Sequence, residues 1–204
     1  MQIRFLIILS IFSFGISGLF AQDFNGGILG GLATSEVSGD RLQGPHKAGL
    51  YLGGFVSRYI SQRSSFQMEL DYIQKGSREN PTEENAYYSY LLRLNYIEIP
   101  VSYKYDFAPK GTLETGLSLG VLVNYYEEAN GSEQVAGAGD FETFDFSFNI
   151  GAYYTLVDDL RINIRYSNSL LPIRPHAGGT SYRLNQGQYN EVLSFVLFYE
   201  FSSR

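Results

Sequence analysis

Two long alternating segments between Ser65 and Tyr105 constrain the fold of this chain more than any other feature. Apolar side chains occupy every second position in both, which is the period of a β-strand. Each segment keeps this pattern for about ten residues, longer than the ~5 to 6 of most soluble strands and close to the ~9 to 11 that a tilted strand needs to cross a bilayer. The stretch 76–86 between them is polar and contains Pro81. We therefore expect a hairpin with a long, solvated loop and one face made for lipid.

The first 21 residues have the pattern of a signal peptide. Arg4 gives a positive start, residues 5–14 form an apolar core, and small residues precede a cleavage position after Ala21. A membrane anchor is the alternative, but serine and glycine residues interrupt the apolar run and no basic flank follows it. We expect residues 1–21 to be removed on export and residues 22–204 to form one domain.

The mature chain contains no run that approaches the ~18 to 20 apolar residues of a transmembrane helix, so it is either soluble or a membrane barrel. Removing Arg4 from 15 basic residues leaves 14 against 21 acidic residues, a net charge of −7. This charge argues against binding to nucleic acid, because the phosphates would be repelled. The chain has no cysteine, which excludes disulfides and thiolate metal ligands.

Alternating runs recur along the whole mature chain, and eight can be counted. Besides the opening pair they cover residues 26–35, 47–59, 112–125, 141–155, 160–166 and 189–201. The connections after the second, fourth and sixth runs are short, whereas those after the first, third, fifth and seventh are long. This pattern is typical of outer-membrane barrels. The sequence predicts an all-β fold: an eight-stranded antiparallel up-and-down transmembrane β-barrel with short periplasmic turns and longer extracellular loops.

Aromatic residues are abundant, with 17 Tyr and 15 Phe, and they cluster at the ends of the runs. Such residues favour the two interfaces of a membrane, because an apolar ring and a polar tip suit the headgroup level. We expect one girdle at the short turns and another at the long loops. The first comprises Tyr59, Tyr103, Tyr105, Phe107, Tyr153, Tyr154, Tyr199 and Phe201, and the second Tyr72, Tyr87, Tyr88, Tyr125, Tyr126, Phe141 and Tyr166. Core aromatics of a soluble β-domain are the alternative interpretation.

Two motifs in the opening hairpin resemble a known family. They are Glu69-Leu70-Asp71-Tyr72-Ile73-Gln74-Lys75-Gly76 and Leu94-Asn95-Tyr96-Ile97-Glu98-Ile99-Pro100, and they follow a Gly-rich first run and Gly39-Asp40. This order is similar to that of the PorT-type outer-membrane β-barrel proteins of the Bacteroidota. The resemblance implies an eight-stranded barrel in the outer membrane. The namesake of the family is linked to type IX secretion, a role that the motifs do not by themselves transfer to this chain.

Charged residues on the polar faces of the runs are predicted to point into the barrel. They are Glu69, Asp71, Glu98, Glu114, Arg161 and Arg165. An eight-stranded barrel is narrow enough for side chains to fill it, and charges enclosed there must find partners. We interpret the set as a network of ion pairs that fills the lumen. A path for protons or ions is the alternative, and with it a function as a narrow pore.

The residues give little support for catalysis or for a bound cofactor. The two histidines, His46 and His176, fall in separate long loops and match no metal-ligand spacing. We therefore assign no catalytic, metal or cofactor residues. An outer-membrane enzyme acting on lipid A or peptides, with a loop-borne triad that includes one histidine, is the less favoured alternative.

The longest loop, 168–188, carries the strongest candidates for recognition of a partner. Prolines stiffen it, and it contains an aromatic residue and a cation of the types enriched at interface hot spots. The candidates are Pro172, Arg174, Pro175, His176 and Tyr182. We expect a structural, binding or accessory component of the cell envelope with three partners: outer-membrane lipid, an envelope protein and, during insertion, the barrel assembly machinery. The alternating last run, with Phe195, Tyr199 and Phe201, resembles the pattern which that machinery reads, although three further residues follow it.

Overall fold

The computed structural model describes residues 24–39, 47–132, 139–175 and 187–201. Within these ranges no helix is long and apolar enough to cross a membrane. The predicted signal peptide, residues 1–21, lies outside the described residues.

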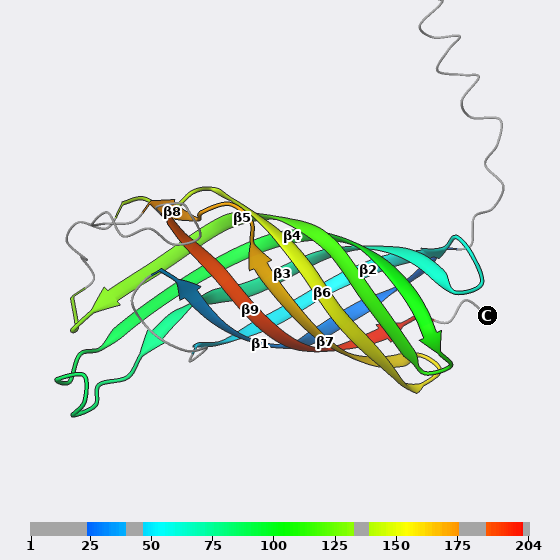
Figure 1. Cartoon of the computed structure of the whole chain (residues 1–204), viewed down its shortest axis with the longest axis horizontal. Helices are drawn as coiled ribbons and strands as arrows, with labels where there is room; N and C mark the ends of the chain where they lie inside the picture. Colours follow the sequence, from blue (N-terminus) through cyan, green and yellow to red (C-terminus); the bar gives the residue numbers. More distant parts are fainter. Residues whose placement is uncertain (1–23, 40–46, 133–138, 176–186, 202–204) are drawn as a thin grey trace, which may run out of the picture.

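The described chain forms one closed antiparallel sheet (Figure 1). Each long strand pairs with the next along the chain, and β1 pairs with β9 to close the barrel. The elements are β1 (Asn25–Ser38), β2 (Lys47–Tyr59), β3 (Ser64–Glu79), β4 (Tyr90–Ala108), β5 (Gly111–Ala129), β6 (Phe144–Val157), β7 (Leu160–Ser169), β8 (Arg174–Pro175) and β9 (Gly187–Glu200). The predicted eight-stranded barrel is confirmed, with β8 as a short addition that pairs only with the start of β9.

The lengths of the strands differ from the sequence expectation mainly at the loop end of the barrel. β4 and β5 have 19 residues each and extend well beyond the last residue pair of β5 with β6, Val121 with Phe144. Short turns join β2 to β3, β4 to β5 and β6 to β7, at the end where Phe201 donates its backbone N–H to the carbonyl of Gly26 at 2.7 Å. Both ends of the described chain therefore lie beside the short turns, as Figure 1 shows. In an outer-membrane barrel this end is periplasmic.

The alternation of side chains divides the wall into an apolar outside and a largely polar inside. On β3, Phe66, Met68 and Leu70 are exposed, whereas Gln67 and Glu69 between them are buried. On β4 the apolar outward positions run from Ile97 to Tyr105, and these residues of a strand tilted by about 40° rise roughly 20 Å. This height suits the ~25 Å apolar band of transmembrane barrels.

Most aromatic residues follow the predicted girdles, but Tyr153 and Phe141 do not: Phe141 is half-buried and packs against the core at the barrel mouth. Tyr153 was expected at the membrane interface, but its side chain is only 3 % exposed and lies inside the barrel. The neighbouring Tyr154 is the one that faces outward, because adjacent strand residues point to opposite faces. Assigning both tyrosines to one girdle was wrong.

A bulge between β4 and β5 changes which side chains face inward at the loop end. Tyr96 pairs with Leu122 and Asn95 with Asn124, so Val123 is the extra residue. The extra residue shifts the alternation by one position. As a result Glu127, which pairs with the inward residue Leu92, points into the barrel mouth.

Candidate functional site

The inward positions of the strands fill the lumen with ionic and polar side chains. β3 alone contributes Gln67, Glu69, Asp71 and Lys75, all almost completely buried. Period-two alternation places these four on one face of the strand. Some of their partners are on the neighbouring strands β2 and β4, and others are on β6 and β7, so the site is a network that crosses the lumen.

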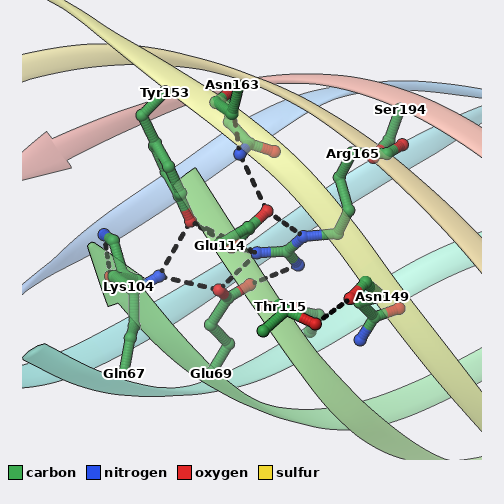
Figure 2. Close-up of polar contacts among 12 residues, drawn as sticks. Gln67, Glu69, Lys104, Glu114, Thr115, Asn149, Tyr153, Asn163, Arg165 and Ser194 are labelled. Atoms are coloured by element: carbon green, nitrogen blue, oxygen red, sulfur yellow. Dashed lines mark hydrogen bonds and ion pairs between the residues drawn. The ribbon is translucent and has the colours of Figure 1, made fainter. Parts of the chain in front are cut away.

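Arg165 on β7 lies at the centre of the first group, which we call the Arg165 cluster: Arg165, Glu69, Glu114, Tyr51 and Tyr153. Its Nη1 and Nη2 donate to both oxygens of Glu69 at 2.9 and 2.7 Å, and its Nε and Nη2 donate to both oxygens of Glu114 at 2.8 and 2.9 Å. Figure 2 shows the guanidinium between these two carboxylates. Nη1 and Nη2 also donate to the hydroxyls of Tyr51 at 2.8 Å and Tyr153 at 3.3 Å. Charge-assisted, bidentate hydrogen bonds of this kind are strong and fix geometry.

Neutral groups and a second cation complete this layer. Gln67 donates to Glu69 at 2.7 Å, Asn163 donates to Glu114 at 2.9 Å, and the hydroxyl of Tyr51 donates to Asp71 at 3.0 Å. Lys104 donates to the side-chain oxygen of Gln67 at 2.8 Å, and its Nζ lies 4.0 Å from the centre of the Tyr153 ring. Unlike Arg165, Lys104 forms no ion pair within 4 Å among the described residues.

Lys75 organises a second group nearer the loop end, which we call the Lys75 cluster: Lys75, Glu98, Asp145, Ser169 and Asn190. The Lys75 Nζ lies 2.5 Å from Glu98 and 2.9 Å from Asp145. Asp145 also accepts hydrogen bonds from Ser169 at 2.7 Å and from Asn190 at 2.9 Å. These contacts join β3, β4, β6, β7 and β9 across the lumen.

Apolar side chains fill the lumen between the Lys75 cluster and the loop end. Leu92, Leu94 and Tyr96 of β4 have no exposed surface, and neither has Ile173 from the segment before β8. The backbone of Ile173 donates to Gln188 and accepts from Glu142, at 2.8 and 2.7 Å, so the segment is tied down on both sides. Ile173 thus packs into the barrel mouth as part of this apolar layer.

Above Ile173 lies a buried ion pair. The guanidinium of Arg174 donates to both oxygens of Glu127 at 2.8 and 3.0 Å and to Gln188 at 2.8 Å, and it lies 4.2 Å from the ring centre of Phe141. Burial alone would lower the pKa of Arg174, but the hydrogen bonds and charge of Glu127 outweigh it, and the pKa lies above its ordinary value. The cation is therefore held in the mouth. We call Arg174, Glu127, Gln188 and Phe141 the mouth cluster.

The opposite, periplasmic end of the lumen is open. A cavity of about 380 Å³ lies between the short turns, lined by Tyr59, Arg63, Asp106, Arg161 and neighbouring residues. Arg161 pairs there with Glu200 at 2.6 Å, and Thr112 donates to Asp106 at 2.6 Å.

The structure brings most of the predicted lumen charges together. Glu69, Glu114 and Arg165 meet in one cluster with Asp71 beside it, and Glu98 belongs to the other. Arg161, by contrast, lies at the rim, where 14 % of its side chain is exposed. It faces inward, but the barrel ends at this level.

Of the five loop residues predicted for recognition, the structure describes three, and only part of these are exposed. Arg174, expected to face outward, is instead buried in the mouth cluster, where each of its three side-chain nitrogens donates to Glu127 or Gln188. That expectation is wrong for Arg174. Pro175 is exposed beside it and Pro172 is half-buried. His46, His176 and Tyr182 lie outside the described residues.

The predicted set of lumen charges lacks four buried residues, Lys47, Lys75, Lys104 and Asp145. All four are in phase with buried positions of their own strands: Tyr51 on β2, Asp71 on β3, Glu98 on β4 and Ser147 on β6. Extending the pattern along each strand would have found them. Glu127 could not be found in this way, because the bulge at Val123 reverses the phase before it.

The arrangement is suited to holding the walls of the barrel together across the lumen. Arg165 and Lys75, the bases of the two clusters, each bind two buried carboxylates inside the lumen. In the part of the chain that the structure describes, no group of three or more His, Cys, Asp or Glu residues is placed to hold a metal ion.

Comparison with solved structures supports the fold. Neisserial surface protein A has 12 % identity and a TM-score of 0.51, over 87 % of this chain and 97 % of that one. The Yersinia pestis attachment invasion locus protein Ail, in complex with the heparin analogue sucrose octasulfate, has 10 % identity and a TM-score of 0.50, over 88 % and 99 % of the two chains. At this identity the likeness is one of fold alone. No curated protein sequence matches the chain significantly.

The comparison with protein families is more direct. Residues 20–174 match the family described as outer membrane protein beta-barrel domain. This range covers seven of the eight barrel strands and the segment that closes the mouth. The chain therefore belongs to the outer membrane protein beta-barrel domain family, and it is a multi-pass β-barrel of the outer membrane.

Proposed function

We propose that this protein is a non-conducting outer-membrane barrel that serves as a structural and binding component of the cell envelope. The observation that carries the proposal is the engagement of Arg165 with Glu69 and Glu114, which ties opposite walls of the lumen together. A pore for ions or small solutes needs a continuous water-filled path. Three successive layers of side chains in the lumen argue against such a path.

The three layers are the charged clusters, the apolar layer around Ile173 and the mouth cluster, and each opposes the passage of an ion in its own way. The Arg165 and Lys75 clusters occupy the lumen with charges that are already paired, so an entering ion would have to displace a partner. Ile173 and the leucines of β4 form an apolar layer that offers an ion no ligands. The mouth cluster then anchors the segment that carries Ile173. This succession supports a filled scaffold over the alternative of a narrow pore.

A sealed barrel can still act through its outer end. β3, β4 and β5 extend beyond the apolar band, and the longest connections lie at the same end. Since Arg174 faces the lumen, it positions the last loop and does not contact a partner. We therefore place the binding surface on residues 176–186, which include His176 and Tyr182, and on the neighbouring loops. A partner protein of the envelope is the ligand we propose.

The same geometry supports a role other than catalysis. An outer-membrane enzyme acting on lipid A or peptides needs a nucleophile and a base within hydrogen-bond reach. Glu69, Glu98, Glu114 and Asp145 are instead bound to lysine, arginine and amide groups inside the barrel. A loop-borne triad with His46 or His176 is the competing hypothesis that the experiment below also tests.

We further infer that the chain is of the PorT type. The motifs that carry this resemblance supply Glu69, Asp71, Lys75 and Glu98, so they encode one side of both lumen clusters. Because these motif residues build the lumen clusters, the resemblance supports an interior of the same kind in this chain and in the PorT-type barrels. A link to a secretion machine of the Bacteroidota is then one form that the envelope partner takes.

A pull-down from outer membranes tests the binding proposal. The full-length protein is compared with a variant in which residues 176–186 are replaced by Gly and Ser, which leaves Ile173, Arg174 and Gln188 in place. We expect the variant to fold and to lose the partner. A second variant, with both His46 and His176 changed to Ala, is expected to keep it.

Two outcomes would contradict the proposal. A partner retained by the loop variant would place the contact on the barrel wall or the periplasmic turns. A cellular phenotype lost only in the histidine variant, with partner binding intact, would favour the enzyme hypothesis.

A further inference from the structure

Four polar side chains form a row on the outer wall of the barrel, where lipid would otherwise favour apolar residues. They are Tyr72, Gln74, Asn95 and Asn124, and we call them the amide row. Gln74 donates to the hydroxyl of Tyr72 at 3.0 Å, Tyr72 donates to Asn95 at 3.1 Å, and Asn95 donates to Asn124. The row crosses β3, β4 and β5. Its members are linked in a chain by these three bonds, Asn124 at the end of the row is exposed, and the row marks the level at which the wall becomes polar.

This level is the outer edge of the apolar band. Asn95 is the next outward residue after Ile97, and Asn124 follows the outward residues Leu119 and Val121. The next outward position on β4, Arg93, is two residues farther along a tilted strand, a rise of about 5 Å. Arg93 is therefore at the height of the lipid headgroups in the outer leaflet.

Arg93 has a second arginine beside it. In the pairing of β3 with β4, Arg93 is opposite Gly76 and Arg78 is opposite Leu91, so the two arginines are diagonal neighbours on the outer face. Diagonal neighbours on adjacent strands are within reach of long side chains. Gly76 has no side chain of its own beside Arg93, and the Lys47 side chain passes close to it, since a Cβ atom at Gly76 would lie 3.0 Å from Lys47 Cδ. Both arginines are exposed.

Neither arginine has a carboxylate partner within 4 Å in the described part of the chain. The nearest acid on the same face is Glu128, which pairs with Leu91 and accepts a hydrogen bond from the hydroxyl of Tyr126 at 2.6 Å. On the outer face two arginines are set against one acid; Glu79, which lines a pocket with Arg78 and Glu128, pairs with the inward residue Tyr90 and accepts a hydrogen bond from Asn85 at 2.8 Å. Arginine also binds phosphate through two parallel hydrogen bonds, better than lysine does.

The opposite side of the barrel has the reverse charge at its loop end. There Glu36 of β1 is directly opposite Glu191 of β9, both on the outer face. An anionic headgroup would be repelled by this pair and attracted to the wall of β3 to β5. The barrel is therefore polarised around its circumference at the headgroup level.

We propose that the wall formed by Arg78, Arg93 and the amide row binds the headgroup of a phosphorylated saccharide lipid in the outer leaflet. The two guanidinium groups bind its phosphate, and the amide row binds hydroxyl groups of the sugar below. The site holds one lipid on one side of the barrel. This inference goes beyond the proposed function, because it does not depend on the lumen or on the loop 176–186.

The test uses the full-length protein in nanodiscs of phosphatidylcholine with a small fraction of diphosphoryl lipid A, analysed for retained lipid by native mass spectrometry. The wild type is expected to retain one lipid A molecule. Arg93→Gln and Arg78→Gln are each expected to weaken retention about tenfold, the effect of losing one charge-assisted hydrogen-bonded contact. Arg58→Gln is the matched control, because Arg58 is exposed on the outer face at the periplasmic end and lies over the ring of Phe24.

Three results would overturn the proposal. One is equal loss of lipid A in Arg58→Gln and Arg93→Gln, which would show attraction by charge alone. Another is equal retention of phosphatidylglycerol, which has the phosphate but not the disaccharide. The third is unchanged retention in the double variant of Arg78 and Arg93. Heat-dependent mobility on gels confirms that each variant is folded, so that loss of lipid is not loss of the barrel.

Discussion

Arg165 on β7 lies 2.7 Å from the carboxylate of Glu69 on β3, so a single ion pair joins two strands that are not neighbours in the sheet. The same guanidinium binds Glu114 on β5 at 2.8 Å. One residue thereby fixes the distance between three parts of the wall. Buried ion pairs stabilise a structure only when geometry and additional hydrogen bonds offset the loss of hydration, and here the hydroxyls of Tyr51 and Tyr153 complete the set.

Removing Arg165 should be among the most damaging single changes in the barrel. In Arg165→Ala, Glu69 and Glu114 lose their shared cation in a lumen that water reaches poorly, and we expect a loss of about 3 to 5 kcal/mol in the free energy of unfolding. Urea unfolding from lipid vesicles measures it. Arg58→Ala, at an exposed position, should change the value little. An unchanged midpoint for Arg165→Ala would show that the cluster does not form.

The two buried lysines should respond differently to the same substitution. Lys75→Met leaves Glu98 and Asp145 without their cation and should cost about 3 to 5 kcal/mol. Lys104→Met loses one hydrogen bond to Gln67 and should cost only about 1 to 2 kcal/mol. The comparison uses the same unfolding assay. An equal loss of unfolding free energy in the two variants would mean that ion pairing does not decide how much a buried lysine stabilises this barrel.

Two adjacent glycines of β2 offer a test of the packing of the lumen. A Cβ atom at Gly53 would lie 2.1 Å from Asp71 Oδ1 and 2.6 Å from the carbonyl of Leu70, whereas at Gly54 the nearest atom is 3.5 Å away. Gly53→Ala should therefore destabilise the barrel by about 1 to 3 kcal/mol through overpacking. Gly54→Ala should be tolerated. A tolerated Gly53→Ala would show that the lumen has room which the described packing does not allow.

The mouth cluster can be loosened without touching the lower barrel. Arg174→Gln removes the ion pair with Glu127, and the segment that carries Ile173 should open more often. Hydrogen exchange reports this directly, since the amides of Ile173 and Glu142 are bonded at the mouth. We expect both amides to exchange faster, and amides of β2 to be unaffected. Uniform acceleration along the chain would indicate global destabilisation instead.

The barrel could be predicted from sequence because its wall obeys one rule almost everywhere. Residues such as Leu70 and Glu69 alternate between lipid and lumen, and the short and long connections give the topology. The identity of the central ion pairs could not be predicted, because which inward charges meet depends on the closure and tilt of the barrel. Two local departures were also hidden: the bulge at Val123, and the strand β8, which has only two residues.

Arg174 illustrates why loop residues were harder to place. A cation between two prolines in a long loop suggests an exposed recognition site. Its partner Glu127 can reach it only because the bulge turns the Glu127 side chain into the barrel mouth. Phe141, whose ring lies against the guanidinium, comes from the segment before β6. The contact joins three segments whose approach no local pattern encodes. Recognition therefore shifts, in our proposal, to the residues that follow Arg174.

Conductance of the purified protein in planar lipid bilayers tests the central claim most directly, because it measures whether any path crosses the lumen. Folding is verified by heat-dependent mobility before the measurement. A lumen closed by the Arg165 cluster, the Lys75 cluster and Ile173 predicts no open-channel steps above the bilayer background, and no swelling of liposomes with small sugars. Stable, reproducible conductance steps from the folded wild-type protein would contradict the account and show that the barrel is a pore.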